Sequence, residues 1–275
     1  MSTRARQYAA EVLKRERLTP HLVRLTLGGT GLAGFETTGI PDEWVGLVVP
    51  QQFQSRYYTV RSWEPWTGSG PGAELVLDVV VHETGLVTEW AARECVGETV
   101  TISEPRGSFA MPDSAAWLLL VGDLTAMPAM ARIVESVGRD RLDHRQIRVW
   151  AEVPDADVLR ASGYLPDGVD VTWLEPPGPG QSDLAAVVEE IDWPVGEGYF
   201  WMAGESAQMR AIRKHLMRER KLPSTQYDVM GYWRSVAQRQ PRAVDPGPIW
   251  RAGKAAGKSD EEIWADYDAA QEASR

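Results

Sequence analysis

The chain has 275 residues, of which 43% are hydrophobic and 25% are charged, and its formal net charge is −10 at pH 7. This composition excludes a disordered chain, and the length predicts roughly two domains. A nucleic-acid binder needs clustered Lys and Arg, so the acidic balance disfavours a nucleic-acid partner.

The residues that bind metals and form disulfides are scarce. The single cysteine, Cys95, excludes an internal disulfide and a protein-ligated iron–sulfur cluster. The histidines lack metal-ligand spacing, so we expect no dedicated metal site. No run approaches the ~18 apolar residues of a membrane helix, and the polar N-terminus lacks the core of a signal peptide. We therefore expect a cytoplasmic protein without an integral membrane segment.

Residues 1–112 show short alternating stretches separated by glycine and proline. The predicted strands cover residues 9–17, 22–27, 44–49, 57–63, 74–82 and 98–103. A single helical stretch is predicted at 87–93. Six short strands of this kind predict a small antiparallel β-barrel, which forms the first domain and ends near Pro112.

In residues 113–237, strands alternate with helices. The predicted strands cover residues 117–121, 147–153, 169–174 and 199–203, and the predicted helices cover 128–137, 155–161, 183–191 and 206–221. This alternation predicts βαβ units and an α/β nucleotide-binding domain with a parallel sheet. Residues 238–275 are predicted to form a linker and a final helix, in which Ser259 and Glu262 have capping-box spacing.

An antiparallel barrel followed by a parallel α/β domain is the arrangement of a reductase that uses flavin and nicotinamide. On the predicted strand at 57–63, side chains alternate, so Arg56 and Tyr58 share one face. An arginine there can clamp a pyrophosphate, a tyrosine can stack on a flavin ring, and Thr59 can bond to a ring nitrogen. The alternative is an aromatic-rich strand with an arginine that faces solvent.

A second motif lies at 82–90, where a strand ends at His82, Gly85 relaxes the turn and a helix begins. Helix N-termini present N–H groups to phosphates, so this turn fits a diphosphate. The alternative is that Thr84 is an ordinary N-cap and His82 a core or edge histidine.

Three further motifs, at 122–128, 203–206 and 231–234, lie at strand ends of the α/β domain. Parallel sheets bind ligands beyond the carboxyl ends of their strands, which places Thr125 at the crevice. Gly204 would let a nicotinamide ring approach the backbone, and the aromatic residues at 232 and 233 could cover either ring. The alternatives are capped turns and an edge strand that buries its aromatic residues.

Taken in order, these motifs resemble the siderophore-interacting protein family, which are FAD-containing ferric-siderophore reductases within the ferredoxin-reductase-like superfamily. The matching stretches are RYYTVR (56–61), VVVHETGLVTEWA (79–91), VGDLTAMPA (121–129), WMAGESAQMRAIRKHL (201–216) and GYWR (231–234). The chain departs from the family in the turn after His82 and at Leu124, where the family has an acidic residue.

The resemblance assigns roles to individual residues. The residues implied to bind FAD are Arg56, Tyr58, Thr59, His82, Gly85, Val87, Thr88 and Asp123. The residues expected at the reacting flavin ring, as catalytic residues, are Thr59 and Thr125. The residues implied on the nicotinamide side are Gly204, Glu205 and Trp233. The residues that could meet an anionic ferric siderophore, as substrate-binding residues, are Arg61 and Arg234.

The implied reaction passes a hydride from NAD(P)H to FAD and then single electrons to Fe(III) in a siderophore, which releases Fe(II). Three acidic residues after the second α/β strand, Glu152, Asp155 and Asp157, favour NADH over NADPH, because a carboxylate repels a 2′-phosphate. Two alternatives stay open: a flavin reductase of the same superfamily for another acceptor, and a non-enzymatic siderophore-binding module. We expect a monomer.

Overall fold

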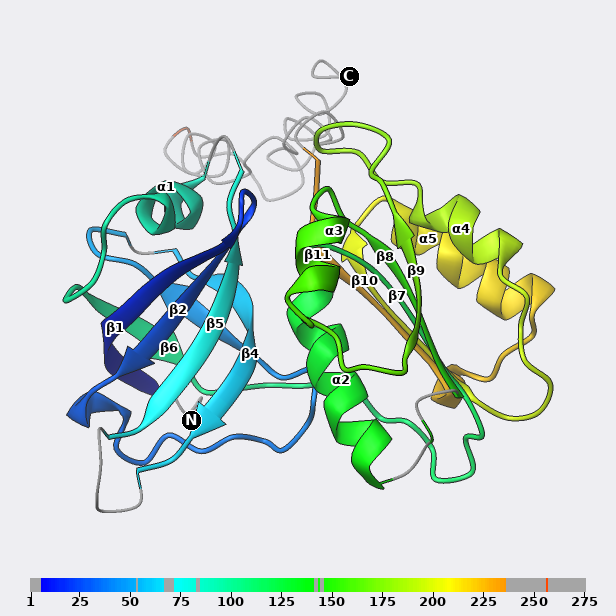
Figure 1. Ribbon diagram of the computed structural model, residues 1–275, viewed down its shortest axis with the longest axis horizontal. Coiled ribbons are helices and arrows are strands. Elements are labelled where there is room, and N and C mark those ends of the chain that lie inside the picture. Colours follow the sequence, from blue (N-terminus) through cyan, green and yellow to red (C-terminus); the bar gives the residue numbers. More distant parts are fainter. Residues whose placement is uncertain are drawn as a thin grey trace. The chain divides into compact units, whose positions relative to one another are not determined.

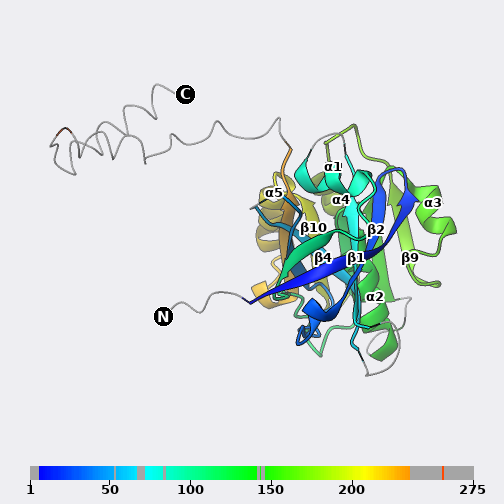
Figure 2. The same ribbon diagram turned by 90° about the vertical axis from the view of Figure 1, so that its left-hand side faces the viewer.

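The structure is a computed structural model, and it describes residues 6–52, 54–66, 72–82, 85–140, 143, 146–235 and 256. The chain divides into two compact units, Met1–Trp233 and Arg234–Arg275. The predicted final helix, with Ser259 and Glu262, and the predicted N-cap Thr84 lie outside the described residues. The fold below is that of the first unit (Figures 1 and 2).

The first part of this unit is a closed barrel of antiparallel strands in the order β1-β2-β5-β4-β3-β6. The strands are β1 (Gln7–Thr19), β2 (Leu22–Gly28), β3 (Trp44–Val48), β4 (Arg56–Glu64), β5 (Glu74–Val80) and β6 (Thr99–Ser103). Helix α1 (Leu86–Ala92) packs Val87 and Trp90 into the barrel core. The predicted six-stranded barrel and its helix are confirmed, and a short 3-10 turn, Thr30–Leu32, was not predicted.

The second part is a parallel sheet in the order β11-β10-β7-β8-β9. Its strands are β7 (Leu118–Asp123), β8 (Ile147–Glu152), β9 (Asp170–Leu174), β10 (Tyr199–Glu205) and β11 (Tyr227–Trp233). Its helices are α2 (Met127–Asp140), α3 (Ala156–Ala161), α4 (Leu184–Glu190) and α5 (Gln208–Lys214). Helix α2 covers the face toward the barrel, and α4 and α5 cover the other face (Figure 1). The central strands β7 and β10 are buried throughout, as expected for a parallel sheet covered on both faces.

The helix predicted at 206–221 is shorter than expected. Helix α5 ends at Lys214, and the chain continues as a π-helical turn, His215–Glu219. In this turn the Arg220 N–H donates to the His215 carbonyl oxygen at 3.0 Å, five residues back. An α-helical turn and a π-helical turn bury similar residues, so hydrophobic periodicity cannot predict where the α-helix gives way to the π-helical turn.

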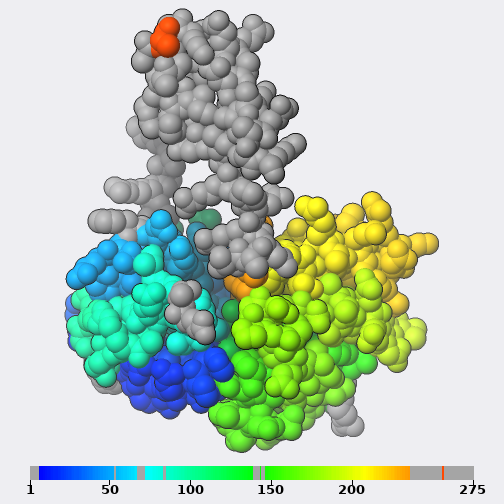
Figure 3. Space-filling model, turned by 90° about the horizontal axis from the view of Figure 1, so that it is seen from above, coloured from blue at the N-terminus to red at the C-terminus, as the bar shows by residue number. Residues whose placement is uncertain are grey.

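The barrel and the sheet share a hydrophobic core. Leu22, at the start of β2, is fully buried in the cluster that α2 forms with the sheet, and Leu18 and Val80 of the barrel pack against that cluster. In Figure 3 the barrel (blue to cyan) and the α/β part (green to yellow) are in direct contact. Both parts therefore belong to one compact unit, and the domain boundary at residue 112 stays a prediction.

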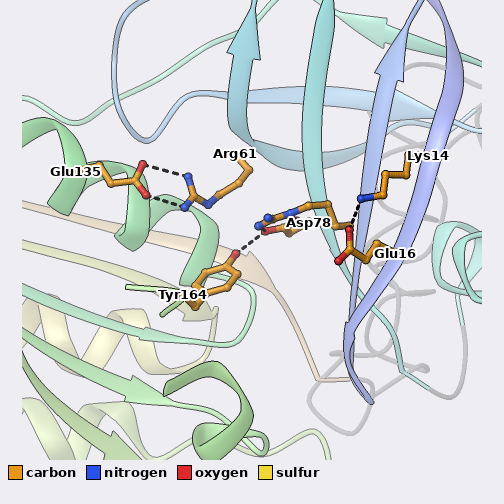
Figure 4. Close-up of polar contacts among 7 residues, drawn as sticks. Lys14, Glu16, Arg61, Asp78, Glu135 and Tyr164 are labelled. Carbon is orange, nitrogen blue, oxygen red and sulfur yellow. Dashed lines mark hydrogen bonds and ion pairs between the residues drawn. The ribbon is translucent and has the colours of Figure 1, made fainter. Parts of the chain in front are cut away.

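Polar contacts also join the two parts (Figure 4). Arg61 of β4 forms a bidentate ion pair with Glu135 of α2, at 2.6 and 3.1 Å. Tyr164, which follows α3, donates its hydroxyl to Asp78 of β5 at 2.6 Å. The two carboxylate oxygens of Asp78 also accept hydrogen bonds from Nε and Nη2 of Arg24, each at 2.7 Å. Burial, and then the neighbouring Asp78 charge, raise the pKa of Tyr164, so its hydroxyl keeps the proton that it donates.

Candidate functional site

Acidic and aromatic side chains gather at the carboxyl edge of the parallel sheet. Strands β7, β8, β10 and β11 end at Asp123, Glu152, Glu205 and Trp233. The three carboxylic residues are only 6%, 3% and 2% exposed. Carboxylates buried to this extent need hydrogen-bond partners, and those partners define the geometry of the edge.

Asp123 lies at the centre of this edge. Its Oδ1 accepts the Thr125 backbone N–H at 2.9 Å and the Thr125 hydroxyl at 2.5 Å. Its Oδ2 accepts the Trp233 Nε1–H at 2.6 Å. Burial raises the pKa of Asp123, and these hydrogen bonds oppose the rise. The structure thus brings together Asp123, Thr125 and Trp233, which were all predicted to lie at the site. The proton of the Thr125 hydroxyl is already used in the bond to Asp123.

Neighbouring residues fix the ends of β10 and β11. Ser206 donates its backbone N–H and its hydroxyl to the Trp233 carbonyl oxygen, at 2.8 and 2.7 Å. The Glu205 Oε2 accepts the N–H of Ala207, so this predicted nicotinamide residue also has a partner within its own turn. Ser206 lay inside a predicted motif but was not singled out. Its bonds reach a residue 27 positions away, which no local pattern reveals.

The barrel meets the sheet at Thr59 of β4. Thr59 is only 5% exposed, and the side chain of Tyr232 from β11 lies beside it. The Tyr232 hydroxyl is buried and reaches no partner in good hydrogen-bond geometry among the described residues. Burial, and then the charge of Asp42, raise the pKa of Tyr232, and its contact with the Thr59 side chain opposes the rise, so Tyr232 is a neutral phenol whose donor lacks a well-aligned acceptor. The sequence motif contained Tyr232, but nothing in it indicated contact with the barrel.

The start of β4 presents a cation and two tyrosines. Arg56 is exposed, and its guanidinium donates to the Ser55 carbonyl at 3.1 Å and to Gln54 Oε1 at 3.3 Å, both local acceptors. Tyr58 packs against the barrel core, which raises its pKa through burial. Tyr57, which the sequence analysis left out, points to the other side of the strand and is 70% exposed.

The residues predicted to seat the pyrophosphate lie around the start of α1. Gly85 has a φ of 141°, which favours glycine, and a Cβ there would lie 3.3 Å from His82 Cε1. Val87 is buried in the barrel core. Thr88 is also buried, and its hydroxyl donates to the Val80 carbonyl at 3.2 Å. At Val87 and Thr88, backbone N–H groups rather than side chains are therefore available to an anion.

The two arginines predicted to bind substrate are in different situations. Arg61 makes the bidentate ion pair with Glu135 and is only partly exposed. Arg234 is exposed and belongs to the second unit of the chain. Arg61 and Arg234 thus belong to different units of the chain, and their role at the substrate stays a prediction.

The acidic segment predicted to favour NADH is largely engaged within the protein. The Glu152 Oε1 accepts a backbone N–H at the start of α4 at 2.9 Å, and burial raises the pKa of Glu152. The Asp155 Oδ2 accepts the Thr19 hydroxyl at 2.6 Å and lies 2.9 Å from His21 Nδ1. The side chain of Asp157 is 98% exposed. Asp157 is thus the exposed carboxylate of the three, and it lies 3.8 Å from the guanidinium of Arg160, a cation that could also meet a 2′-phosphate.

Two absences concern the part of the chain that the structure describes. Within it, no group of three or more His, Cys, Asp or Glu residues is arranged to hold a metal ion. Across the same residues, no helix combines the length and the apolar character needed to cross a membrane.

Comparisons with known proteins give consistent matches for both parts. The family model of the siderophore-interacting FAD-binding domain matches residues 11–56 and 51–109, and that of the siderophore-interacting protein matches 115–236. An NADPH-dependent ferric-chelate reductase of Escherichia coli is 26% identical over 242 residues, covering 81% of this chain and 91% of its own. A ferric vibriobactin reductase of Vibrio cholerae is 25% identical over 248 residues, covering 82% and 88%. The crystal structure of a siderophore utilization protein from T. fusca is similar with a TM-score of 0.67 at 28% identity, covering 86% and 95%.

Proposed function

The chain belongs to the siderophore-interacting protein family, and from this we propose that it is an FAD-dependent NAD(P)H reductase of ferric siderophores. The observation that carries the proposal is the contact of β4 with β11. There the buried Tyr232 hydroxyl, whose donor lacks a well-aligned acceptor, lies beside Thr59, where the FAD-binding barrel meets the parallel sheet.

The side chains around this contact fit a flavin nucleotide. Tyr232 offers a buried donor without a well-placed acceptor, and flavin rings carry nitrogen and oxygen acceptors. Arg56 offers an exposed guanidinium whose present bonds are local, which suits a pyrophosphate. The backbone at Val87 and Thr88 can supply further N–H donors. FAD thus agrees with the donor set of the barrel, which is also the part matched by an FAD-binding family.

The protein's own residues would then hold and orient the cofactors. Arg56 binds the pyrophosphate, Tyr58 lies against the flavin ring, and Thr59 bonds to it. When bound, FAD supplies the redox chemistry, accepting a hydride from NAD(P)H and passing electrons singly to Fe(III). The carboxyl edge of the sheet receives the nicotinamide, and Trp233 forms a wall there.

Iron enters this scheme as substrate. Fe(III) remains in its siderophore during electron transfer, and Fe(II) leaves because hard oxygen ligands hold it less tightly. A general base is not required. We place the activity in the cytoplasm, where NAD(P)H is available, and in a monomer.

The deciding experiment is an anaerobic assay of the FAD-loaded protein with NADH or NADPH, a panel of ferric catecholates and hydroxamates, and a ferrous chelator as trap. We expect two Fe(II) per nucleotide oxidised, because a hydride carries two electrons and each iron accepts one. Comparison of kcat/KM for the two nucleotides tests the NADH preference, which now depends on the exposed Asp157.

Two other outcomes would reject the proposal. Oxidation of NAD(P)H with free flavin or one-electron carriers, but with no ferric siderophore, would indicate a reductase for another acceptor. A colourless protein that binds ferric siderophores without oxidising NAD(P)H would indicate a binding module.

A further inference from the structure

We propose that Asp123 is a positioning residue, whose buried carboxylate fixes the orientation of the Trp233 indole and thereby sets where the nicotinamide ring can lie. The proposal depends on the proposed function for the identity of the nucleotide. The contact between Asp123 and Trp233 itself belongs to the protein alone.

The contact crosses a strand. Asp123 ends β7 and Trp233 ends β11, and β10 lies between these strands in the sheet. The Nε1–H···Oδ2 bond of 2.6 Å therefore passes over the end of β10, where Gly204 lies. A Cβ on Gly204 would be 2.7 Å from Asp123 Oδ2, closer than real Cβ contacts come. Any larger residue would displace the carboxylate, so glycine at this position permits the bond to cross.

The Trp233 residue is held at its backbone as well as at its ring. Ser206 bonds to the Trp233 carbonyl oxygen through both its N–H and its hydroxyl, which fixes the backbone at the end of β11. The pairing of β10 with β11 also shifts here, because Gly204 pairs with Gly231 and Glu205 with Trp233. Such irregularities re-aim side chains near functional sites. With the backbone fixed, the hydrogen bond to Asp123 sets the orientation of the Trp233 indole.

A carboxylate suits this task better than an amide. Asp123 uses Oδ1 for both bonds from Thr125 and Oδ2 for Trp233, so both of its oxygens act as acceptors. Asparagine could keep one oxygen toward Thr125, but its NH2 group would then face the indole N–H, donor against donor. Asp123→Asn therefore removes the ring contact with little change in size. Trp233→Phe removes the indole donor and keeps an aromatic ring.

The first test measures the contact without any nucleotide or turnover. In ¹H–¹⁵N spectra of the full chain, Trp233→Phe assigns the Trp233 indole resonance. We expect hydrogen exchange at this N–H to be about tenfold faster in Asp123→Asn than in the wild type, because a bond to a charged group is lost. The wild-type resonance should also titrate at a pH above the ordinary Asp range, because burial raises the pKa of Asp123. This titration should be absent in Asp123→Asn.

The second test asks whether Asp123 acts through the indole. Asp123→Asn should raise the KM for NAD(P)H about tenfold, because the lost bond involves a charged group. In the Trp233→Phe background, Asp123→Asn should change the same KM by less than about twofold, because the interaction energy of coupled residues is lost with the first substitution.

The outcomes separate the two proposals. An indole resonance that is unchanged in Asp123→Asn overturns the positioning role, whatever the activity of the enzyme. An equal effect on KM in both backgrounds also overturns it and indicates that Asp123 touches the nucleotide directly. A protein that shows the indole changes and the coupled effect on NAD(P)H oxidation, but reduces no ferric siderophore, rejects the proposed substrate and supports the positioning role.

Discussion

Two arginines on the same strand show how the use of a side chain depends on its surroundings. Arg61 is bound by both carboxylate oxygens of Glu135, so its charge is compensated within the protein. Arg56 is exposed and bonds to neutral acceptors within two residues. The sequence motif contains both arginines and could not distinguish them, because Glu135 lies 74 positions from Arg61. The exposure and the neutral partners of Arg56 support its proposed role toward an anionic cofactor.

Replacing Arg56 by alanine should therefore weaken FAD binding and leave the fold intact. Loss of a charge-assisted hydrogen bond costs about 2 kcal/mol, which corresponds to roughly a 30-fold rise in Kd for FAD. The apoprotein should unfold within about 0.5 kcal/mol of the wild type, because the side chain is exposed. Titration of apoprotein with FAD measures the first effect, and Arg218→Ala, on the exposed side of the α/β part, serves as the control. An unchanged Kd for FAD in Arg56→Ala would refute the assignment.

Helix α2 is joined to the barrel through a partly buried arginine. Arg132 donates to the Val60 carbonyl of β4 at 2.6 Å and to Glu43 Oε1 at 3.0 Å. Glu43 is fully buried, and its other oxygen accepts the N–H and the hydroxyl of Thr38, both at 2.7 Å. A buried carboxylate without its cation is costly, so this contact fixes α2 against β4.

Arg132→Met should consequently destabilise the protein by about 3 kcal/mol, because the apolar stem is kept while Glu43 loses its cation. Urea unfolding gives this difference, and Arg218→Met should stay within about 0.5 kcal/mol of the wild type. The double variant Arg132→Met/Glu43→Gln should recover part of the loss, since it removes the uncompensated charge. No recovery in the double variant would show that packing, rather than charge, explains the effect.

At the scale of helices and strands, the sequence predicted the features that local patterns of residues determine. Alternating and helical periodicity located the barrel strands, four of the five strands of the parallel sheet and its helices, because burial repeats every two or about 3.6 residues. The links between elements were not predictable in the same way. Asp123 meets Trp233 across 110 positions, and Arg132 meets Glu43 across 89. The resemblance placed several residues at one site, but only the tertiary fold shows which of them bond to one another.

In the molecule as a whole, buried carboxylic groups lie where the barrel meets the sheet. The Ser108 hydroxyl lies 2.6 Å from Asp228 of β11 and 3.0 Å from Asp42 of the barrel. Burial, and then the charge of Asp42, raise the pKa of Asp228 above its ordinary value of 3.8. A hydroxyl has one proton to donate, so a protonated Asp228 lets Ser108 accept from one acid and donate to the other.

A pH dependence of stability follows from this shift. The native state binds the Asp228 proton more tightly than the unfolded chain does, so the stabilisation is complete below pH 3.8 and is lost as pH rises through the raised pKa. The Asp228→Asn variant has no group at this position that can ionise. The Tm of the variant minus that of the wild type should therefore increase between about pH 4 and 7. Asp157→Asn, at an exposed carboxylate, should show no such trend in the same thermal melts.

The position of Leu22 has a consequence for how this architecture can be inherited and recombined. This barrel residue is buried in the core of the parallel sheet, with Leu18 and Val80 packed against it. If the barrel were replaced by that of a distant relative, side chains of different volume would enter this core. Volume mismatches in a core cost about 1–3 kcal/mol. Successful chimeras must therefore carry the matching surface of α2 with the barrel, so the exchangeable module extends past the chain segment that links the two parts.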